Sequence, residues 1–259
     1  DMNITKYVCV EWEGRVDVID ALGGLDLDLT KEEVHWVNGY ITETANSIGY
    51  PCDALKGEGR VHLNGVQAVS YSRIRYTSGD DFLRASRQRI VLQAILEKCK
   101  GEDIATLTSM CSSMMDDIST NFTVKEILAL AKNVTKYQIS STTGFPYNVA
   151  TKELSGVGDT VIPIDLATDV VQLHKYLFED ESYTVSDTVQ SISDTVQKKT
   201  DVDSKTDIYD TTKYNNTAGS TGTEGAKKKN KDAQDALKKS QSESENDSTT
   251  KSSSDDSDD

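Results

Sequence analysis

Arginine is concentrated in one short segment of the chain, and this is where the sequence first points to chemistry. Five of the seven arginines fall between Arg73 and Arg89, and the other two are Arg15 and Arg60. The guanidinium group is a rigid fork of N–H donors that stays charged, which suits bidentate capture of phosphate oxygens. In a chain with a formal net charge of −15, the cluster predicts a binding site for a phosphate-bearing ligand.

The spacing of these residues favours the same ligand. Arg73 and Arg75 are two residues apart, so an extended segment places both on one face. Arg84 and Gln88 are four residues apart and share a helix face. If Asp81 is the N-cap of that helix, the first turns also offer free amides and the positive end of the helix dipole.

The same residues also allow a plainer interpretation, in which the arginines pair with carboxylates on a solvated face. Asp80, Asp81 and Glu97 are the carboxylates at hand along the chain. The residues alone leave the ligand site and the solvated face both open.

The hydrophobic pattern predicts an α/β scaffold for these side chains. Leu25 to Leu29 alternates strictly, as in a half-buried strand, and Thr30 with Glu33 forms a capping box that starts a helix over 32–45. A short helix should follow Asn64. The other predicted helices cover 16–22, 82–100, 103–115, 124–132, 165–178 and 185–195. The other predicted strands lie at 7–10, 137–140 and 160–164.

Composition limits the partners. From residue 200 onward the strongly apolar residues are only Val202, Ile208, Tyr209, Tyr214 and Leu237, so we expect a disordered tail. The acidic balance argues against nucleic acid, which requires a basic face, and against attachment to an anionic membrane surface through this chain. No run of about 18 apolar residues that could cross a bilayer occurs in it.

Other chemical motifs are weak. The four cysteines, at 9, 52, 99 and 111, match no zinc pattern. We expect Cys9 to be buried. The sequence allows either four free thiols or one disulfide. Asp26 and Asp28 share the polar face of a strand. They could be metal ligands, or they could simply face the solvent. The chain lacks the GxxxxGK[ST] phosphate loop of nucleotide-binding proteins.

Three segments resemble elements of the LytR-CpsA-Psr family, in the family's order and at similar separations. Residues 16–27 read VDVIDALGGLDL and resemble its VDALGGV element. Residues 63–75 read LNGVQAVSYSRIR, and residues 79–89 read GDDFLRASRQR; they resemble its LNGEQALAYVRxR and GDFGRxxRQ elements. Leu83 stands where the family pattern has glycine, a change we expect to be tolerated.

The resemblance implies a fold and a division of the chain. The expected fold is α/β, with a central mixed sheet flanked by helices and truncated at its N-terminus. Residues 1–100 would be the C-terminal part of the catalytic domain, residues 101–195 a mostly helical extension, and residues 196–259 a disordered acidic and serine-rich tail. Because the chain starts at Asp1, almost inside a strand, we expect it to be a fragment that lacks the family's membrane helix and first strands.

The resemblance also implies a function. Family members transfer a glycopolymer from a polyprenyl-pyrophosphate carrier to peptidoglycan, on the extracytoplasmic face of the membrane, with Mg²⁺. Arg73 and Arg75 would grip the pyrophosphate, Arg84 and Gln88 would complete the head-group site, and Asp81 and Arg87 would orient them. The Mg²⁺ ligands and the general base match no residue of this chain, and we expect them upstream of Asp1.

Two other functions stay open at this point. The chain could be a non-catalytic envelope module that binds polyprenyl pyrophosphate or another anion, because the metal-binding part of the family pattern has no counterpart in it. It could also be a structural envelope protein whose arginines pair internally.

Overall fold

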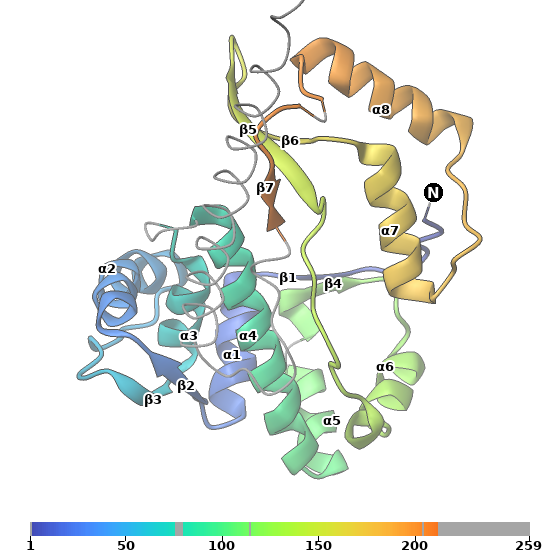
Figure 1. Cartoon of the computed structure of the whole chain (residues 1–259). Coiled ribbons are helices and arrows are strands. Elements are labelled where there is room, and N and C mark those ends of the chain that lie inside the picture. Colours follow the sequence, from blue (N-terminus) through green and yellow to red (C-terminus); the bar gives the residue numbers. More distant parts are fainter. Residues whose placement is uncertain (1, 76–79, 114, 204, 212–259) are drawn as a thin grey trace, which may run out of the picture.

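The structure, a computed structural model, describes residues 2–75, 80–113, 115–203 and 205–211. Helices and short strands alternate along the chain, which confirms the predicted α/β class (Figure 1). Within these residues the strands form three small antiparallel sheets, β1–β4, β2–β3 and β6–β5–β7, in place of one central mixed sheet.

The largest part is a helical core that contains all the residues of the arginine cluster. Its elements are α1 (Trp12–Ala21), β2 (Leu25–Leu29), α2 (Lys31–Ile48), β3 (Gly59–Leu63), α3 (Gly65–Arg73) and α4 (Asp80–Gly101). The alternation predicted for β2 is confirmed, because Leu25, Leu27 and Leu29 are all buried. The Thr30–Glu33 capping box at the start of α2 is also present.

Two of the three family elements meet inside this core. The Asp20 carboxylate, from the VDALGG-like segment, accepts a 2.6 Å hydrogen bond from the backbone N–H of Gly65, the first residue of α3. A Cβ added at Gly65 would lie 2.7 Å from the Cα of Val16, which is closer than side chains are found. The glycine therefore lets α1 and α3 pack backbone to backbone.

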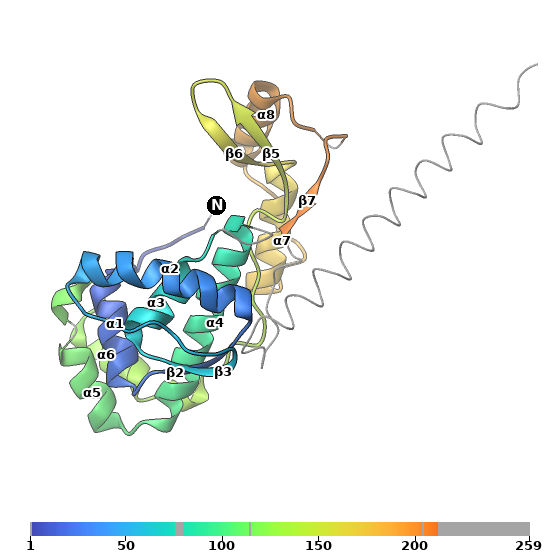
Figure 2. The same cartoon turned by 90° about the vertical axis from the view of Figure 1, so that its left-hand side faces the viewer.

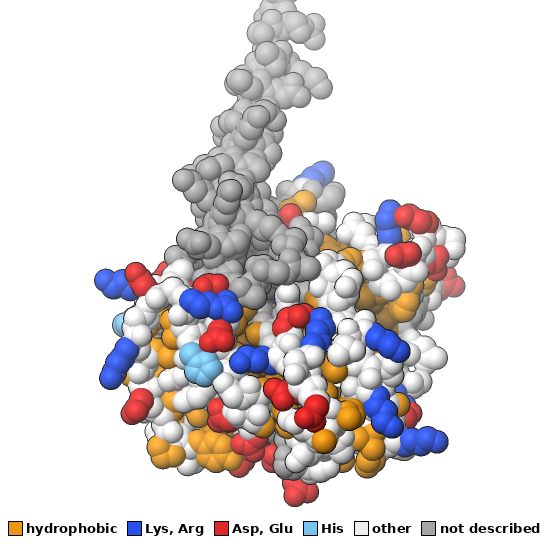
Figure 3. Space-filling model, turned by 90° about the horizontal axis from the view of Figure 1, so that it is seen from below, with side chains coloured by type: hydrophobic (Ala, Val, Ile, Leu, Met, Phe, Trp, Pro, Cys, Tyr) orange, Lys and Arg blue, Asp and Glu red, His pale blue; other side chains and the backbone are white. Residues whose placement is uncertain are grey.

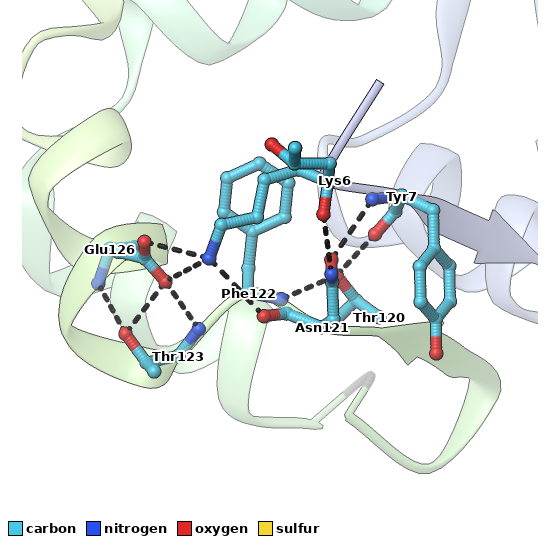
Figure 4. Close-up of polar contacts among 8 residues, drawn as sticks. Lys6, Tyr7, Thr120, Asn121, Phe122, Thr123 and Glu126 are labelled. Carbon is cyan, nitrogen blue, oxygen red and sulfur yellow. Dashed lines mark hydrogen bonds and ion pairs between the residues drawn. The ribbon is translucent and has the colours of Figure 1, made fainter. Parts of the chain in front are cut away.

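Residues after 100 pack against the N-terminal segment. These elements are α5 (Ile104–Ser113), η1 (Met115–Asp117), β4 (Ile118–Thr120), α6 (Val124–Ala131) and η2 (Val134–Lys136), and β4 pairs with β1 (Val8–Val10). Lys6 Nζ lies 2.8 Å from Glu126 Oε1, and Asn121 Nδ2 donates to the Thr5 carbonyl at 2.7 Å (Figure 4). The hydrogen bond from Lys6, aided by the N–H of Thr123, lowers the pKa of Glu126 to about 2. Residues 1–100 are therefore not a separate structural unit.

The remaining elements form a C-terminal unit that stands beside the core (Figure 2). It consists of β5 (Asn148–Leu154), β6 (Gly158–Pro163), α7 (Leu166–Phe178), α8 (Asp187–Thr200) and β7 (Tyr209–Asp210). Its small apolar cluster contains Ala150, Ile162, Ile164 and Val202. The side chain of Val202 is 1% exposed, so the chain just after α8 is part of the fold.

Several predictions need correction. The tail cannot start at 196, because α8 continues to Thr200 and β7 pairs with β5. Residues 137–140 form no strand; they follow the 3₁₀ turn η2. Cys9 is exposed, since β1 has only β4 beside it, and all four cysteines are free thiols. The rest of the predicted tail, residues 212–259, lies outside the described residues.

The face of the molecule seen in Figure 3 carries basic and acidic side chains side by side. Hydrophobic side chains lie among them on the same face. The basic side chains visible on this face do not form an extended stripe.

Candidate functional site

The four residues predicted to bind the head group line one pocket of about 370 Å³. Arg73 ends α3, Arg75 follows two residues later, and Arg84 and Gln88 lie on α4. The other lining residues are Trp12, Arg15, Tyr40, Glu43 and Ser72. Four elements (α1, α2, the end of α3, and α4) therefore bring three predicted arginines and one more, Arg15, around one space.

Arg73 is the most firmly held of these arginines. Its Nη1 donates to Thr44 Oγ1 at 2.7 Å, and its Nη2 donates to Glu43 Oε1 at 2.7 Å. The guanidinium carbon lies 3.9 Å from the centre of the Trp12 ring and 5.3 Å from that of Tyr40, within range of cation–π attraction. The side chain is only 15% exposed, so its orientation is set before any ligand arrives.

The local sequence explains why α3 delivers Arg73 to this place. Asn64 and Gln67 form a capping box that fixes the start of the helix. Val69 and Tyr71 are buried and face the core. Arg73 lies in the last turn, where a cation also interacts favourably with the carbonyl end of the helix.

Arg75 and Arg84 share one carboxylate. Asp81 Oδ2 accepts from Arg75 Nη2 at 3.0 Å, and Asp81 Oδ1 lies 2.9 Å from Arg84 Nη2. The three side chains are between 37% and 47% exposed, and ion pairs this exposed contribute only about 0–1 kcal/mol. Asp81 therefore holds both arginines in place through ion pairs that cost little to exchange for contacts with an incoming anion.

Arg87 faces away from the pocket, into the core. Its side chain is 3% exposed, its Nε donates to Glu33 Oε1 at 3.1 Å, and its Nη1 donates to the Ile74 carbonyl at 3.3 Å. Because Ile74 separates Arg73 from Arg75, this contact ties the loop that carries both arginines to α4. Arg87 thus supports the pocket without lining it.

The pairing of arginines with carboxylates, expected as the plainer interpretation, is also partly present. Glu43 and Asp81 each pair with pocket arginines, whereas Glu97 pairs with Lys100 at 2.7 Å. The side chain of Asp80 lies outside the described residues. The pairs and the pocket coexist, because Arg73, Arg75 and Arg84 line the pocket while each is paired with a carboxylate.

Sequence reasoning missed Trp12, Tyr40, Glu43 and Thr44 as site residues. Trp12 was not predicted as a site residue because the helix predicted from the sequence begins at Val16, whereas α1 begins at Trp12. Glu43 and Thr44 lie in the second half of α2, and Thr44 is fully buried although its type is polar. The signal that the sequence offered was spacing: Thr44 lies seven residues after Val37 and three after Ile41, on the apolar face of the helix, where a hydroxyl needs a partner.

The described residues were predicted to lack the Mg²⁺ ligands, and their side chains form no metal-binding cluster. Among the described ranges, no group of three or more His, Cys, Asp or Glu side chains is arranged to hold one. Asp26 and Asp28 are engaged across the β2–β3 pair: Asp26 with His62 Nδ1 at 2.8 Å, and Asp28 with Arg60 at 3.2 Å. The hydrogen bond from His62 lowers the pKa of Asp26. These residues therefore do not fit a bound Mg²⁺ ion.

None of the helices in the described part of the chain combines the length and the apolar character that crossing a bilayer requires.

Comparison with known proteins identifies the family. Residues 1–171 match the model of the LytR_cpsA_psr family, so the chain belongs to that family. The match runs well past residue 100 and ends at residue 171, within α7. It therefore includes most of the predicted helical extension.

Two curated relatives illustrate the similarity. The polyisoprenyl-teichoic acid–peptidoglycan teichoic acid transferase TagU of Bacillus mycoides (strain KBAB4) is 32% identical over 134 residues, covering 50% of this chain and 38% of TagU. The corresponding transferase TagV of Bacillus subtilis (strain 168) is 29% identical over 129 residues, covering 49% of this chain and 31% of TagV. The matched region is thus less than two fifths of either relative.

Solved structures support the fold. Protein gbs0355 of Streptococcus agalactiae superposes with a TM-score of 0.51 at 24% identity, covering 71% of this chain and 61% of that protein. Protein EF0465 of Enterococcus faecalis, described as a transcriptional regulator, gives a TM-score of 0.51 at 17% identity, covering 77% and 67%. At these identities the likeness concerns the fold alone.

Proposed function

We propose that this chain is part of a transferase that moves a glycopolymer from a polyprenyl-pyrophosphate carrier to peptidoglycan, and that Arg73, Arg75, Arg84 and Gln88 hold the pyrophosphate. The observation that carries the proposal is the single pocket lined by all four side chains. The relatives support the substrate class, because their names describe transfer of polyisoprenyl-linked teichoic acid to peptidoglycan.

The pocket suits this chemistry because its arginines face the atoms on which charge accumulates. An acceptor hydroxyl oxygen attacks the phosphorus that carries the polymer, and a new P–O bond forms. The bond from that phosphorus to the bridging oxygen breaks, and the carrier leaves as a polyprenyl monophosphate. Guanidinium donors fixed beforehand stabilise both the transferring phosphate and the leaving phosphate.

The chain's own residues divide the work between binding and orientation. Arg73 is fixed by Thr44 and Glu43, and it is the group that holds one phosphate in place. Arg75 and Arg84 exchange part of their contact with Asp81 for phosphate oxygens. The proton of the acceptor hydroxyl needs a base. Glu43, which lines the pocket, is paired with Arg73, and Asp81, which lines the adjoining cavity, is paired with Arg75 and Arg84.

The remaining family properties are proposals of the same kind. A membrane anchor, a location on the extracytoplasmic face, and a Mg²⁺ ion that stabilises phosphate charge would belong to the intact protein. Within the described residues, the carboxylates do not assemble a Mg²⁺ site.

Titration of the purified chain with geranyl pyrophosphate tests the binding step. Arg73→Ala and Arg75→Ala should each weaken binding by about 10- to 100-fold, because each removes charge-assisted hydrogen bonds of roughly 1.5–3 kcal/mol. Arg60→Ala is the matched control, since Arg60 pairs with Asp28 away from the pocket. Equal affinities for all four proteins would overturn the proposal.

A second candidate function is a binding module that retains the pyrophosphate but performs no transfer. The pairing of Glu43 and Asp81 with the arginines favours it, because neither carboxylate is then an unoccupied base. Incubation with a carrier-linked polymer and peptidoglycan separates the two functions. Binding without release of polyprenyl phosphate identifies the module, whereas release identifies the transferase.

A further inference from the structure

A second cavity, of about 540 Å³, adjoins the arginine pocket. Arg75 lines both spaces, so the cavity begins where the pyrophosphate pocket ends. The near wall is the start of α4, with Asp81 and Phe82, and the far wall is the β6–β5–β7 sheet of the C-terminal unit. None of the residues on the far wall belongs to the three sequence elements that define the arginine site.

The register of the sheet decides which side chains face this cavity. Directly opposed residues of neighbouring strands point to the same face, and alternate residues point to opposite faces. Ala150 of β5 and Ile162 of β6 are opposed and belong to the small apolar cluster, so their face is covered. Thr151 and its partner Val161 therefore point the other way, to the cavity side.

The same alternation assigns three more side chains to the cavity face. Glu153 and Asp159 are opposed, two residues further along each strand. Tyr209 of β7 is opposed to Val149, which shares the face of Thr151. The ring of Tyr209 stacks on Phe82 of α4, with ring centroids 4.8 Å apart and planes at 22°.

The wall thus combines an aromatic pair, an exposed valine, a hydroxyl and two carboxylates. Lys152 and Thr160 also line the cavity, but they lie on the alternate positions of the two strands, and Lys152 Nζ donates to the Thr200 carbonyl at the end of α8 at 2.6 Å. Val161 is 48% exposed, so its apolar side chain is accessible from the cavity. Aromatic and aliphatic surface suits the C–H faces of pyranose rings, while hydroxyl and carboxylate oxygens accept hydrogen bonds from sugar hydroxyls. Glu153 and Asp159 would repel a chain of phosphodiesters at this wall.

We propose that this cavity binds an uncharged oligosaccharide, held by Tyr209, Thr151 and Glu153, and that it serves as the acceptor subsite of the arginine pocket. Its position supports the acceptor role, because a sugar bound there lies next to Arg75, where the transferring phosphate would be. The acceptor role rests on the proposed function, whereas oligosaccharide binding stands apart from it. Tyr209 lies beyond residue 171, so the segment after the family match completes the subsite.

The experiment is an NMR titration of the whole chain with the β-1,4-linked tetramer of N-acetylglucosamine. The wild type should show saturable shifts at Thr151, Val161 and Tyr209. Tyr209→Ala should weaken binding about three- to ten-fold, the loss of one aromatic contact, while Tyr209→Phe should bind nearly as the wild type. Thr151→Val, which keeps the shape of the side chain, should weaken binding about two- to five-fold by removing one hydrogen bond.

Controls separate this proposal from the pyrophosphate site and from misfolding. Val157→Ala changes an exposed residue in the turn of the same hairpin, outside the cavity, and should not alter the titration. Arg73→Ala should weaken geranyl pyrophosphate binding by the same roughly 10- to 100-fold but keep the tetramer, because Arg73 lines the arginine pocket and not this cavity. Thermal melts identify any variant that fails to fold. If Tyr209→Ala fails to fold, Thr151→Val still tests the proposal.

Three outcomes would overturn the inference. The first is a wild type that shows no saturable shifts with the tetramer. The second is binding that Tyr209→Ala and Thr151→Val leave unchanged. The third is a preference of the same residues for a short polyphosphate over the sugar. A chain that binds the tetramer but not geranyl pyrophosphate would refute the proposed function and leave the oligosaccharide site standing.

Discussion

The two regions that meet at Arg75 are built in opposite ways. The helical core surrounds its pocket with sixteen buried apolar residues and a buried ion pair, whereas the C-terminal unit rests on a cluster of four. The core presents fixed cations, and the sheet presents uncharged and acidic groups on a small support. We infer that the core sets the position of the phosphates, while the C-terminal unit can adjust to a chain of sugars.

The largest effect should follow from removing the buried ion pair that stabilises the core. Arg87→Leu leaves Glu33 charged and buried without its partner, and both side chains are 3% exposed. We expect a loss of about 3–5 kcal/mol in the free energy of unfolding. Urea denaturation measures it, with Arg60→Leu as the control.

Arg60 pairs with Asp28 on the surface, where both side chains are about half exposed. Its replacement should cost about 0–1 kcal/mol. If Arg87→Leu and Arg60→Leu had equal effects, the rigid support that we assign to the core would not depend on the buried pair.

A pH-dependent effect should mark the C-terminal unit. Burial raises the pKa of Asp169 from 3.8 to about 6, although backbone N–H groups of Asn148 and Tyr147 oppose the shift. The folded state therefore holds a proton that the unfolded state releases, so stability is complete below about pH 4 and falls as the pH rises through 6. The loss should be of order 1–3 kcal/mol.

Asp169→Asn should remove this dependence, because the amide does not titrate. Urea denaturation at pH 4, 5, 6 and 7 compares the variant with the wild type. Because carboxylates with a lowered pKa, such as Glu126, gain stability as the pH rises, the difference between wild type and variant isolates Asp169. A difference that does not change with pH would contradict the assignment of the raised pKa to Asp169.

The smallest effect concerns the hydroxyl that orients Arg73. Thr44→Val keeps the shape of a fully buried residue but removes the acceptor of Arg73 Nη1 and the partner of Ser70. We expect a loss of about 1 kcal/mol in stability and a few-fold weaker binding of geranyl pyrophosphate. Thr44→Ser, which retains the hydroxyl, is the control, and identical behaviour of the two variants would remove Thr44 from the site.

Much of the local structure could be predicted from the sequence, because local signals define it. The Thr30–Glu33 capping box starts α2 as predicted, and the Leu25–Leu29 alternation forms β2. Predictions failed where the signal was not local. Residues 137–140 are rich in residues typical of strands but have no neighbouring strand to pair with, and β7 is too short to be noticed.

The site shows the same division. Its arginines were predicted by type and spacing, but Arg73 and Arg75 are not two residues of one extended strand, because Arg73 ends a helix. The sequence also gave no reason to connect Glu33 with Arg87, since 54 residues separate them. Glu33 has two roles, since it caps α2 and also pairs with Arg87. Only the capping role can be predicted from neighbouring residues in the sequence.

The sequence by itself determined the α/β class, the family, and the residues that could hold a phosphate, because propensity, periodicity and side-chain chemistry act over a few positions. The tertiary structure alone decided which arginines line the pocket and that Arg87 is buried behind them, since burial and the nearest carboxylate depend on the packing of distant segments. It also decided that Tyr209 meets Phe82, 127 positions away in the chain, to complete a second cavity beside the first.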